Sequence, residues 1–79
     1  MALERWNLAF NSEMQNRPIL FDLGKRFDLV INVERANISE AAGWVQVTLS
    51  GETEEIQRSI AYLNTLGVFV SPTELAVIA

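Results

Sequence analysis

Two stretches of alternating apolar and polar residues lie between Phe27 and Gly51, and this pattern constrains the fold more than any other feature of the chain. The apolar positions share one parity: Leu29, Ile31, Val33, Val45, Val47 and Leu49. The opposite parity holds Val30, Asn32, Glu34, Trp44, Gln46 and Thr48. Alternation with a period of two is typical of strands that bury one face. We therefore predict an antiparallel pair over residues 28–38 and 43–49.

The segment before this pair predicts a strand and a helix. Residues 4–10 alternate in the same way, with an apolar parity made of Trp6, Leu8 and Phe10. A helix is predicted over 17–27, with Asn16 as its cap and Pro18 in its first turn, where a missing N–H group is harmless. Its apolar side combines Ile19, Leu20, Leu23 and Phe27.

After Gly51 the period of the apolar residues changes from two to that of a helix. Three carboxylates, Glu52, Glu54 and Glu55, open this helix as its dipole favours, and Ile56, Ile60 and Leu63 form its apolar side. Gly67 has the position of a helix stop. A short strand follows at 68–70, and Pro72 should end its pairing.

The order of elements predicts an α+β fold. It is the ferredoxin-like βαββαβ arrangement, a four-stranded antiparallel sheet with two helices on one face. Right-handed crossovers put the first and third strands in the centre. We expect one domain over residues 1–79, with a core from about 4 to 71 and an apolar tail at 72–79.

Composition excludes several classes of function. The 79 residues include no cysteine and no histidine, which removes disulfides, Cys or His metal ligands, and Cys–His catalysis. The net charge of −4 is scattered, so we expect neither nucleic-acid binding nor attraction to an anionic membrane. The first residues do not resemble a signal peptide, and no apolar run is long enough to span a bilayer. We expect a cytoplasmic protein.

The face of the sheet opposite the helices is the candidate functional surface. Its predicted members are Arg5, Asn7, Val30, Asn32, Glu34, Trp44, Gln46, Thr48 and Phe69. Such a mixed face is either solvated, packed against a second copy, or a platform for a ligand. Trp44 either covers the sheet edge or stacks on a ligand.

Catalysis and metal binding are weakly indicated. Asp22, Asp28 and Glu34 belong to different elements and have no identifiable orienting partner. The acidic residues at 52–55 are typical of surface charge at a helix start, with a cation site as the alternative. We expect no enzyme, no metal and no cofactor.

The chain resembles the NIL domain, from about Trp6 to Val70. The resemblance rests on 18–20 (Pro-Ile-Leu), 30–34 (Val-Ile-Asn-Val-Glu), 51–56 (Gly-Glu-Thr-Glu-Glu-Ile), 61–63 (Ala-Tyr-Leu) and 66–70 (Leu-Gly-Val-Phe-Val). The tripeptide that names the family is Asn32-Val33-Glu34 here, so Glu34 replaces a leucine. In methionine importers the resemblance implies that two such domains pair, bind methionine near their interface and inhibit transport.

These observations lead to two functional hypotheses. The first is a stand-alone regulatory, ligand-sensing module that forms a homodimer and binds an amino acid such as methionine. The resemblance implies a ligand site at Asn32, Val33 and Glu34, although Asn32 at an edge strand equally suits a bond to water or to a second copy. The interface would use Val30, Asn32, Trp44, Gln46 and Phe69. The alternative is a protein-interaction module without a small ligand.

Overall fold

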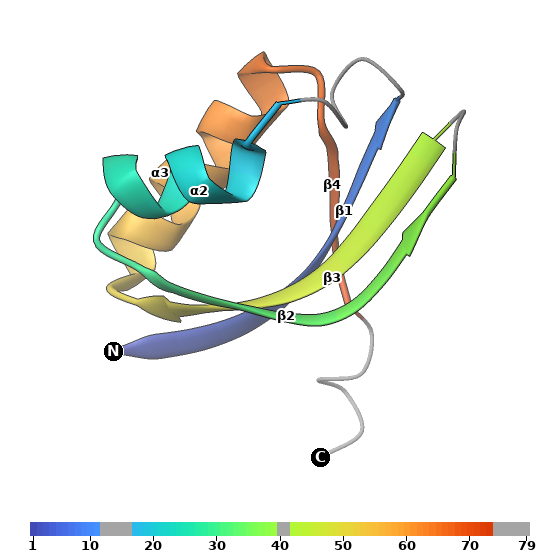
Figure 1. Cartoon of the computed structure of the whole chain (residues 1–79). Coiled ribbons are helices and arrows are strands. Elements are labelled where there is room, and N and C mark those ends of the chain that lie inside the picture. The colour runs from blue at the N-terminus through green and yellow to red at the C-terminus, as the bar shows by residue number, and fades with distance from the viewer. Residues whose placement is uncertain (12–16, 40–41, 74–79) are drawn as a thin grey trace.

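The computed structural model describes residues 1–11, 17–39 and 42–73, and its centre is an antiparallel sheet (Figure 1). The four strands are β1 (Ala2–Asn11), β2 (Val30–Ile38), β3 (Ala42–Gly51) and β4 (Phe69–Pro72). Their order in space is β2-β3-β1-β4, which confirms that the first and third strands are central. Helices α2 (Ile19–Arg26) and α3 (Thr53–Thr65) both lie on one face of the sheet (Figure 1). The ferredoxin-like α+β fold is therefore confirmed.

The core lies between the two helices and the central strands. Val47 and Leu49 of β3 are fully buried, and so are Leu23 of α2 and Ile56 and Leu63 of α3. This apolar parity of the sheet is the one expected to face the helices. The hydrophobic effect therefore fixes which face of the sheet is covered and which stays open.

Helix α3 ends in a Schellman motif. Gly67 has φ of +90°, its N–H group donates to the carbonyl of Asn64 at 3.1 Å, and the N–H of Val68 donates to the carbonyl of Leu63 at 3.1 Å. Val68 and Leu63 are both buried in the core. The predicted stop at Gly67 is correct, because a glycine adopts the left-handed conformation without strain.

Helix α2 is shorter than the predicted 17–27. It begins at Ile19, with Pro18 at the capping position instead of inside the first turn, and it ends at Arg26. The expected cap, Asn16, lies outside the described residues, as do residues 12–15, 40–41 and the apolar tail from residue 74. Phe27 follows as an extended residue whose N–H group still donates to the carbonyl of Leu23.

The strand ends also differ from the sequence prediction. β1 and β3 are longer than 4–10 and 43–49, while β2 begins at Val30 instead of residue 28. β4 spans Phe69–Pro72 instead of 68–70, and its pairing ends at Pro72, opposite Trp6, as predicted. A proline is tolerated because β4 is an edge strand that ends at this point.

A β-bulge interrupts the alternation of β2 at Glu34. Val33 pairs with Val47, but the next pair along the strand is Arg35 with Gln46, so Glu34 and Arg35 together oppose one residue of β3. Strict alternation would have turned Arg35 toward the helices. The bulge instead brings two consecutive charged residues to the open face, and it returns Ala36 and Ile38 to the helix side.

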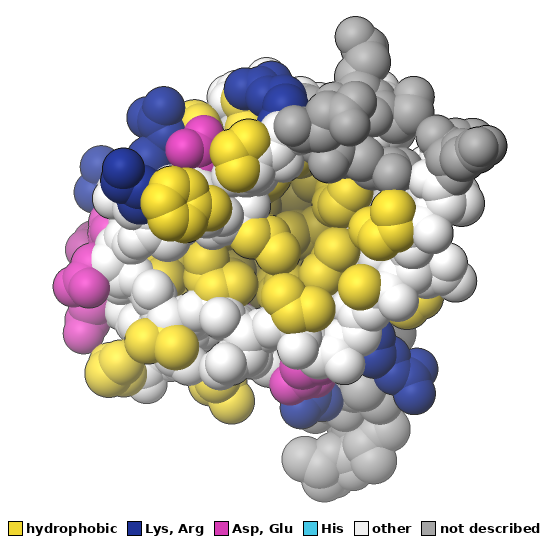
Figure 2. Space-filling model, in the orientation of Figure 1, with side chains coloured by type: hydrophobic (Ala, Val, Ile, Leu, Met, Phe, Trp, Pro, Cys, Tyr) yellow, Lys and Arg dark blue, Asp and Glu magenta, His cyan; other side chains and the backbone are white. Residues whose placement is uncertain are grey.

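The helices cover only part of the concave side of the sheet. Figure 2 shows a hollow lined by hydrophobic side chains on this side. Val33 and Ile38 pair with residues of β3 that face the helices, so their own side chains point to the helix side. The two side chains are nevertheless 53% and 55% exposed. The expectation that Val33 faces the helices is correct in direction, but no helix buries it.

Candidate ligand-binding face

Four rows of three or four side chains run across the open face of the sheet, and the pair Asn11 and Ala42 lies beyond them at the end of β1. Apolar groups dominate the outer rows, which are Leu3, Ser50 and Val30 at one end and Phe69, Ala9, Trp44 and Asn37 at the other. The inner rows are polar: Arg5, Thr48 and Asn32, then Ser71, Asn7, Gln46 and Arg35. Small-molecule sites combine apolar side chains with a few polar groups, and this face offers both kinds.

An ion pair crosses the central strand of this face. The Nε atom of Arg5 on β1 lies 3.2 Å from Oε1 of Glu34 on β2, so the two side chains meet above β3. Thr48 of β3, the row partner of Arg5, is only 5% exposed although no helix covers its side of the sheet. The charge of Glu34 is thus compensated within the face.

The residues of the family tripeptide are divided between the two faces of the sheet. Asn32 pairs with Thr48 on the open face, and Glu34 lies beside it through the bulge. Val33 pairs with Val47 and points to the helix side. The structure therefore brings Asn32 and Glu34 together on one surface, and it does not bring Val33 to that surface.

The open face also contains a polar pocket next to this ion pair. Its volume is about 320 Å³, and its walls are Asn7, Arg35, Trp44 and Gln46. Gln46 and Trp44 were expected on this face. Arg35 was missed, because counting by twos along β2 puts it on the opposite side. The signal that could have found it is the polar run Glu34-Arg35-Ala36-Asn37, which breaks the alternation.

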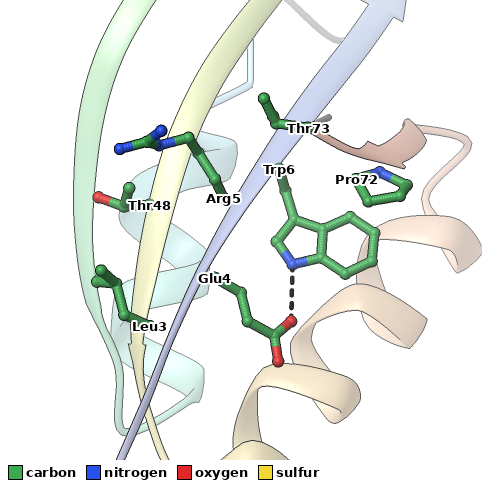
Figure 3. Close-up of a pocket in the computed structure, with 7 residues that line it drawn as sticks. All are labelled: Leu3, Glu4, Arg5, Trp6, Thr48, Pro72 and Thr73. Atoms are coloured by element: carbon green, nitrogen blue, oxygen red, sulfur yellow. Dashed lines mark hydrogen bonds between the residues drawn. The ribbon is translucent and has the colours of Figure 1, made fainter. Parts of the chain in front are cut away.

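A second, more apolar pocket of about 360 Å³ lies at the outer edge of β1, beyond the end of β4 (Figure 3). Trp6 and Pro72 form one wall, and the indole N–H of Trp6 donates to Oε1 of Glu4 at 3.0 Å. Leu3, Arg5 and Thr48 lie on the other side of β1 (Figure 3). None of the ligand residues expected from the sequence lines this pocket.

The acidic residues that the structure describes are spread over separate places. Glu34 is paired with Arg5, and Asp22 lies on α2 across the sheet from it. Oε2 of Glu55 accepts the N–H group of Asp28 at 2.9 Å, and Oε1 of Glu55 lies 2.9 Å from Arg58. Within the described ranges, no group of three or more Asp, Glu, His or Cys side chains is gathered where it could hold a metal ion.

Comparison with known proteins identifies the family. The model of the NIL domain family matches residues 4–72. The chain belongs to the NIL domain family. It is 35% identical over 69 residues to the methionine import ATP-binding protein MetN of Helicobacter pylori, and 32% identical over 69 residues to the same protein of Helicobacter acinonychis. Each match covers 82% of this chain and 21% of the relative, so the NIL domain spans about a fifth of the length of these relatives.

Solved structures support the same fold for this NIL domain. The C-terminal domain of an ABC transporter ATP-binding protein from Enterococcus faecalis superposes with a TM-score of 0.80, at 22% identity, over 91% of this chain and 84% of that one. The de novo designed protein Ferredog-Diesel superposes with a TM-score of 0.60 at 18% identity, over 92% and 85% of the two chains. At these identities the likeness concerns the fold alone. Neither described helix is long and apolar enough to cross a membrane.

Proposed function

We propose that this NIL domain is a non-catalytic regulatory module that binds a small amino acid, with methionine as the leading candidate, on its open face. The support is the relationship to methionine import ATP-binding proteins, together with a face that has polar inner rows and an apolar frame. We place the module in the cytoplasm, because the relatives are ATP-binding proteins and the cytoplasm holds ATP. It involves neither nucleic acid nor insertion into a membrane.

Asn32 is the proposed ligand contact. Its side chain is exposed on the edge strand β2, in the same row as Thr48 and Arg5. An amide donates and accepts hydrogen bonds, which suits both charged groups of an amino acid. Glu34 takes part through its charge, because the ion pair with Arg5 reduces the repulsion that its carboxylate would exert on a ligand carboxylate. Val33 lies on the other side of β2, so its part in the proposed site is to keep the strand in register.

The proposed homodimer forms through the same face. Val30 and Phe69 belong to its two apolar outer rows, and Phe69 is 70% exposed. Trp44 and Gln46 stand between β1 and β2 on the central strand β3. A small domain gains stability when a second copy covers such side chains. A ligand in the polar rows would then lie close to the interface.

The ligand is tested by a thermal-shift screen with the twenty amino acids. A ligand at 100 times its dissociation constant stabilises by about 2.7 kcal/mol, which raises the Tm of a domain this small by roughly 10 °C or more. We expect this shift with methionine, and we expect Asn32→Ala to abolish it. The matched control is Asn64→Ala, since Asn64 is an exposed asparagine of α3 on the covered side of the sheet. If none of the twenty amino acids raises the Tm, the proposal that this domain binds an amino acid is wrong.

The dimer is tested by light scattering over a range of protein concentrations. We expect Phe69→Asp to raise the dissociation constant of the dimer, because it puts a charge into the apolar frame. Phe21→Asp is the matched control, since Phe21 is equally exposed but belongs to α2 on the other face. A native chain that stays monomeric at high concentration would overturn the homodimer.

The second candidate is a protein-interaction module without a small ligand. The observation that favours it is the size of the apolar frame, where Leu3, Val30 and Phe69 are all more than half exposed. In this case no amino acid raises the Tm, and binding to a specific partner protein is lost with Phe69→Asp and with Trp44→Ala. Partner binding that tolerates both substitutions would contradict a role for this face.

A further inference from the structure

Arg35 gives the open face a positive charge. The charged side chains in the four rows and the bulge of the open face are Arg5, Glu34 and Arg35. Their net charge is +1, whereas the net charge of the whole chain is −4. Arg5 and Glu34 neutralise one another at 3.2 Å. Arg35 makes no ion pair within the part of the chain that the structure describes. A positive centre on an acidic protein attracts anions to this location.

The surroundings of Arg35 define what kind of anion fits. The open pocket of about 320 Å³ is lined, besides Arg35, by Asn7 and Gln46, which carry amide groups, and by Trp44, which is 39% exposed. A guanidinium group binds a carboxylate with two parallel hydrogen bonds. The amides supply both donors and acceptors, and the indole offers an apolar surface that also suits a thioether. The chemistry is that of a small organic carboxylate with an apolar body.

We propose that Arg35 and Trp44 form a carboxylate-binding pocket, in which the guanidinium group holds the carboxylate and the indole packs against the apolar part of the ligand. The β-bulge at Glu34 creates this pocket by turning Arg35 to the open face. Identifying the ligand as methionine rests on the proposed function. Asn32 and Arg35 belong to neighbouring rows, which are about 7 Å apart along a strand. One amino acid therefore reaches both residues, with its carboxylate on Arg35 and its ammonium toward Asn32 and Glu34.

The test follows the two indole N–H signals by NMR during titration with three probes. The probes are L-methionine, 4-(methylthio)butanoate, which lacks the ammonium group, and L-methioninamide, which lacks the carboxylate. The Trp44 signal should move with both carboxylates. The Trp6 signal should stay in place, because its indole donates to Glu4 beside a different pocket. Arg35→Gln should weaken binding of both carboxylates by about tenfold to a hundredfold. Arg35→Lys should recover part of the loss, and binding of methioninamide should not respond to either substitution.

The possible results separate this inference from the proposed function. Carboxylate binding that depends on Arg35, with no binding of methionine, supports the pocket and overturns the methionine module. Methionine binding that is unchanged in Arg35→Gln supports the module and overturns the pocket. No response to either carboxylate overturns both. Arg26→Gln is the matched control, since Arg26 lies over the ring of Tyr62 on the helix side and should not affect binding.

Discussion

Arg5 and Glu34 come from strands that are not neighbours, and their ion pair of 3.2 Å passes over Thr48 on the strand between them. The pair connects β1 to the edge strand β2 across the face that we propose for ligand binding. Both side chains are more than a third exposed to solvent, and the energy of such a pair is small. Its main effect is on the charge of the face.

Removing this ion pair should change stability little. We expect Glu34→Gln to lower the free energy of unfolding by no more than about 1 kcal/mol, because water screens the charges. A double-mutant cycle with Arg5→Gln, measured by urea unfolding, gives the coupling between the two side chains. A coupling above roughly 2 kcal/mol would contradict the description of the pair as a surface contact.

Gly51 and Gly24 should respond to alanine in opposite ways. A Cβ atom at Gly51 would lie 2.7 Å from Cδ2 of Leu29 and 3.0 Å from the carbonyl oxygen of Asp28, so Gly51→Ala should destabilise by about 1–3 kcal/mol. At Gly24 the nearest atom is Cδ1 of Ile31 at 3.9 Å. Gly24→Ala should therefore stabilise α2 by about 0.5–1 kcal/mol. The midpoints of urea unfolding measure both changes, and equal effects at the two positions would refute the close approach at Gly51.

The Schellman motif of α3 predicts a purely conformational cost at Gly67. No atom lies within 4 Å of a Cβ added there, but the φ of +90° disfavours every residue with a side chain. Gly67→Ala should lower the free energy of unfolding by about 1–2 kcal/mol. Gly67→Asn should cost less, since asparagine tolerates positive φ better than alanine does. The reverse order in thermal unfolding would show that contacts, and not the backbone conformation, decide this position.

Glu55 should contribute more to stability than its neighbour Glu54. Both carboxylates lie in the first turn of α3, but only Glu55 accepts the N–H group of Asp28 and pairs with Arg58. We expect Glu55→Ala to be more destabilising than Glu54→Ala by about 1 kcal/mol, the usual net contribution of one hydrogen bond. Each substitution removes one charge near the same end of α3. The difference between the two losses of stability therefore measures the contacts of Glu55 with Asp28 and Arg58. Equal losses in urea unfolding would mean that only the helix dipole matters.

The sequence predicts the order of the elements, the order of the strands and the covered face of the sheet, because all three follow from where the apolar residues recur. It does not predict the bulge at Glu34. Counting by twos assumes one residue of β2 for each residue of β3, and the pairing of Arg35 with Gln46 violates that assumption. The ion pair between Arg5 and Glu34 is foreseeable from parity, because both residues are expected on the open face and carry opposite charges. The pocket at Arg35 depends on how β2 pairs with β3. The sequence of one strand alone does not show this pairing.

The strand that carries Asn32 and Arg35 is also the most exposed strand of the sheet. Beyond Ile31 every residue of β2 is exposed, and its outer edge has no partner strand in the described chain, whereas β3 is largely buried. Amide hydrogens of β2 should therefore exchange with solvent through local opening, well before those of β3. A ligand that joined β2 to Gln46 of β3 would close this opening. The sensing signal would then be a loss of motion at one edge of the domain, transmitted to whatever protein contacts that edge.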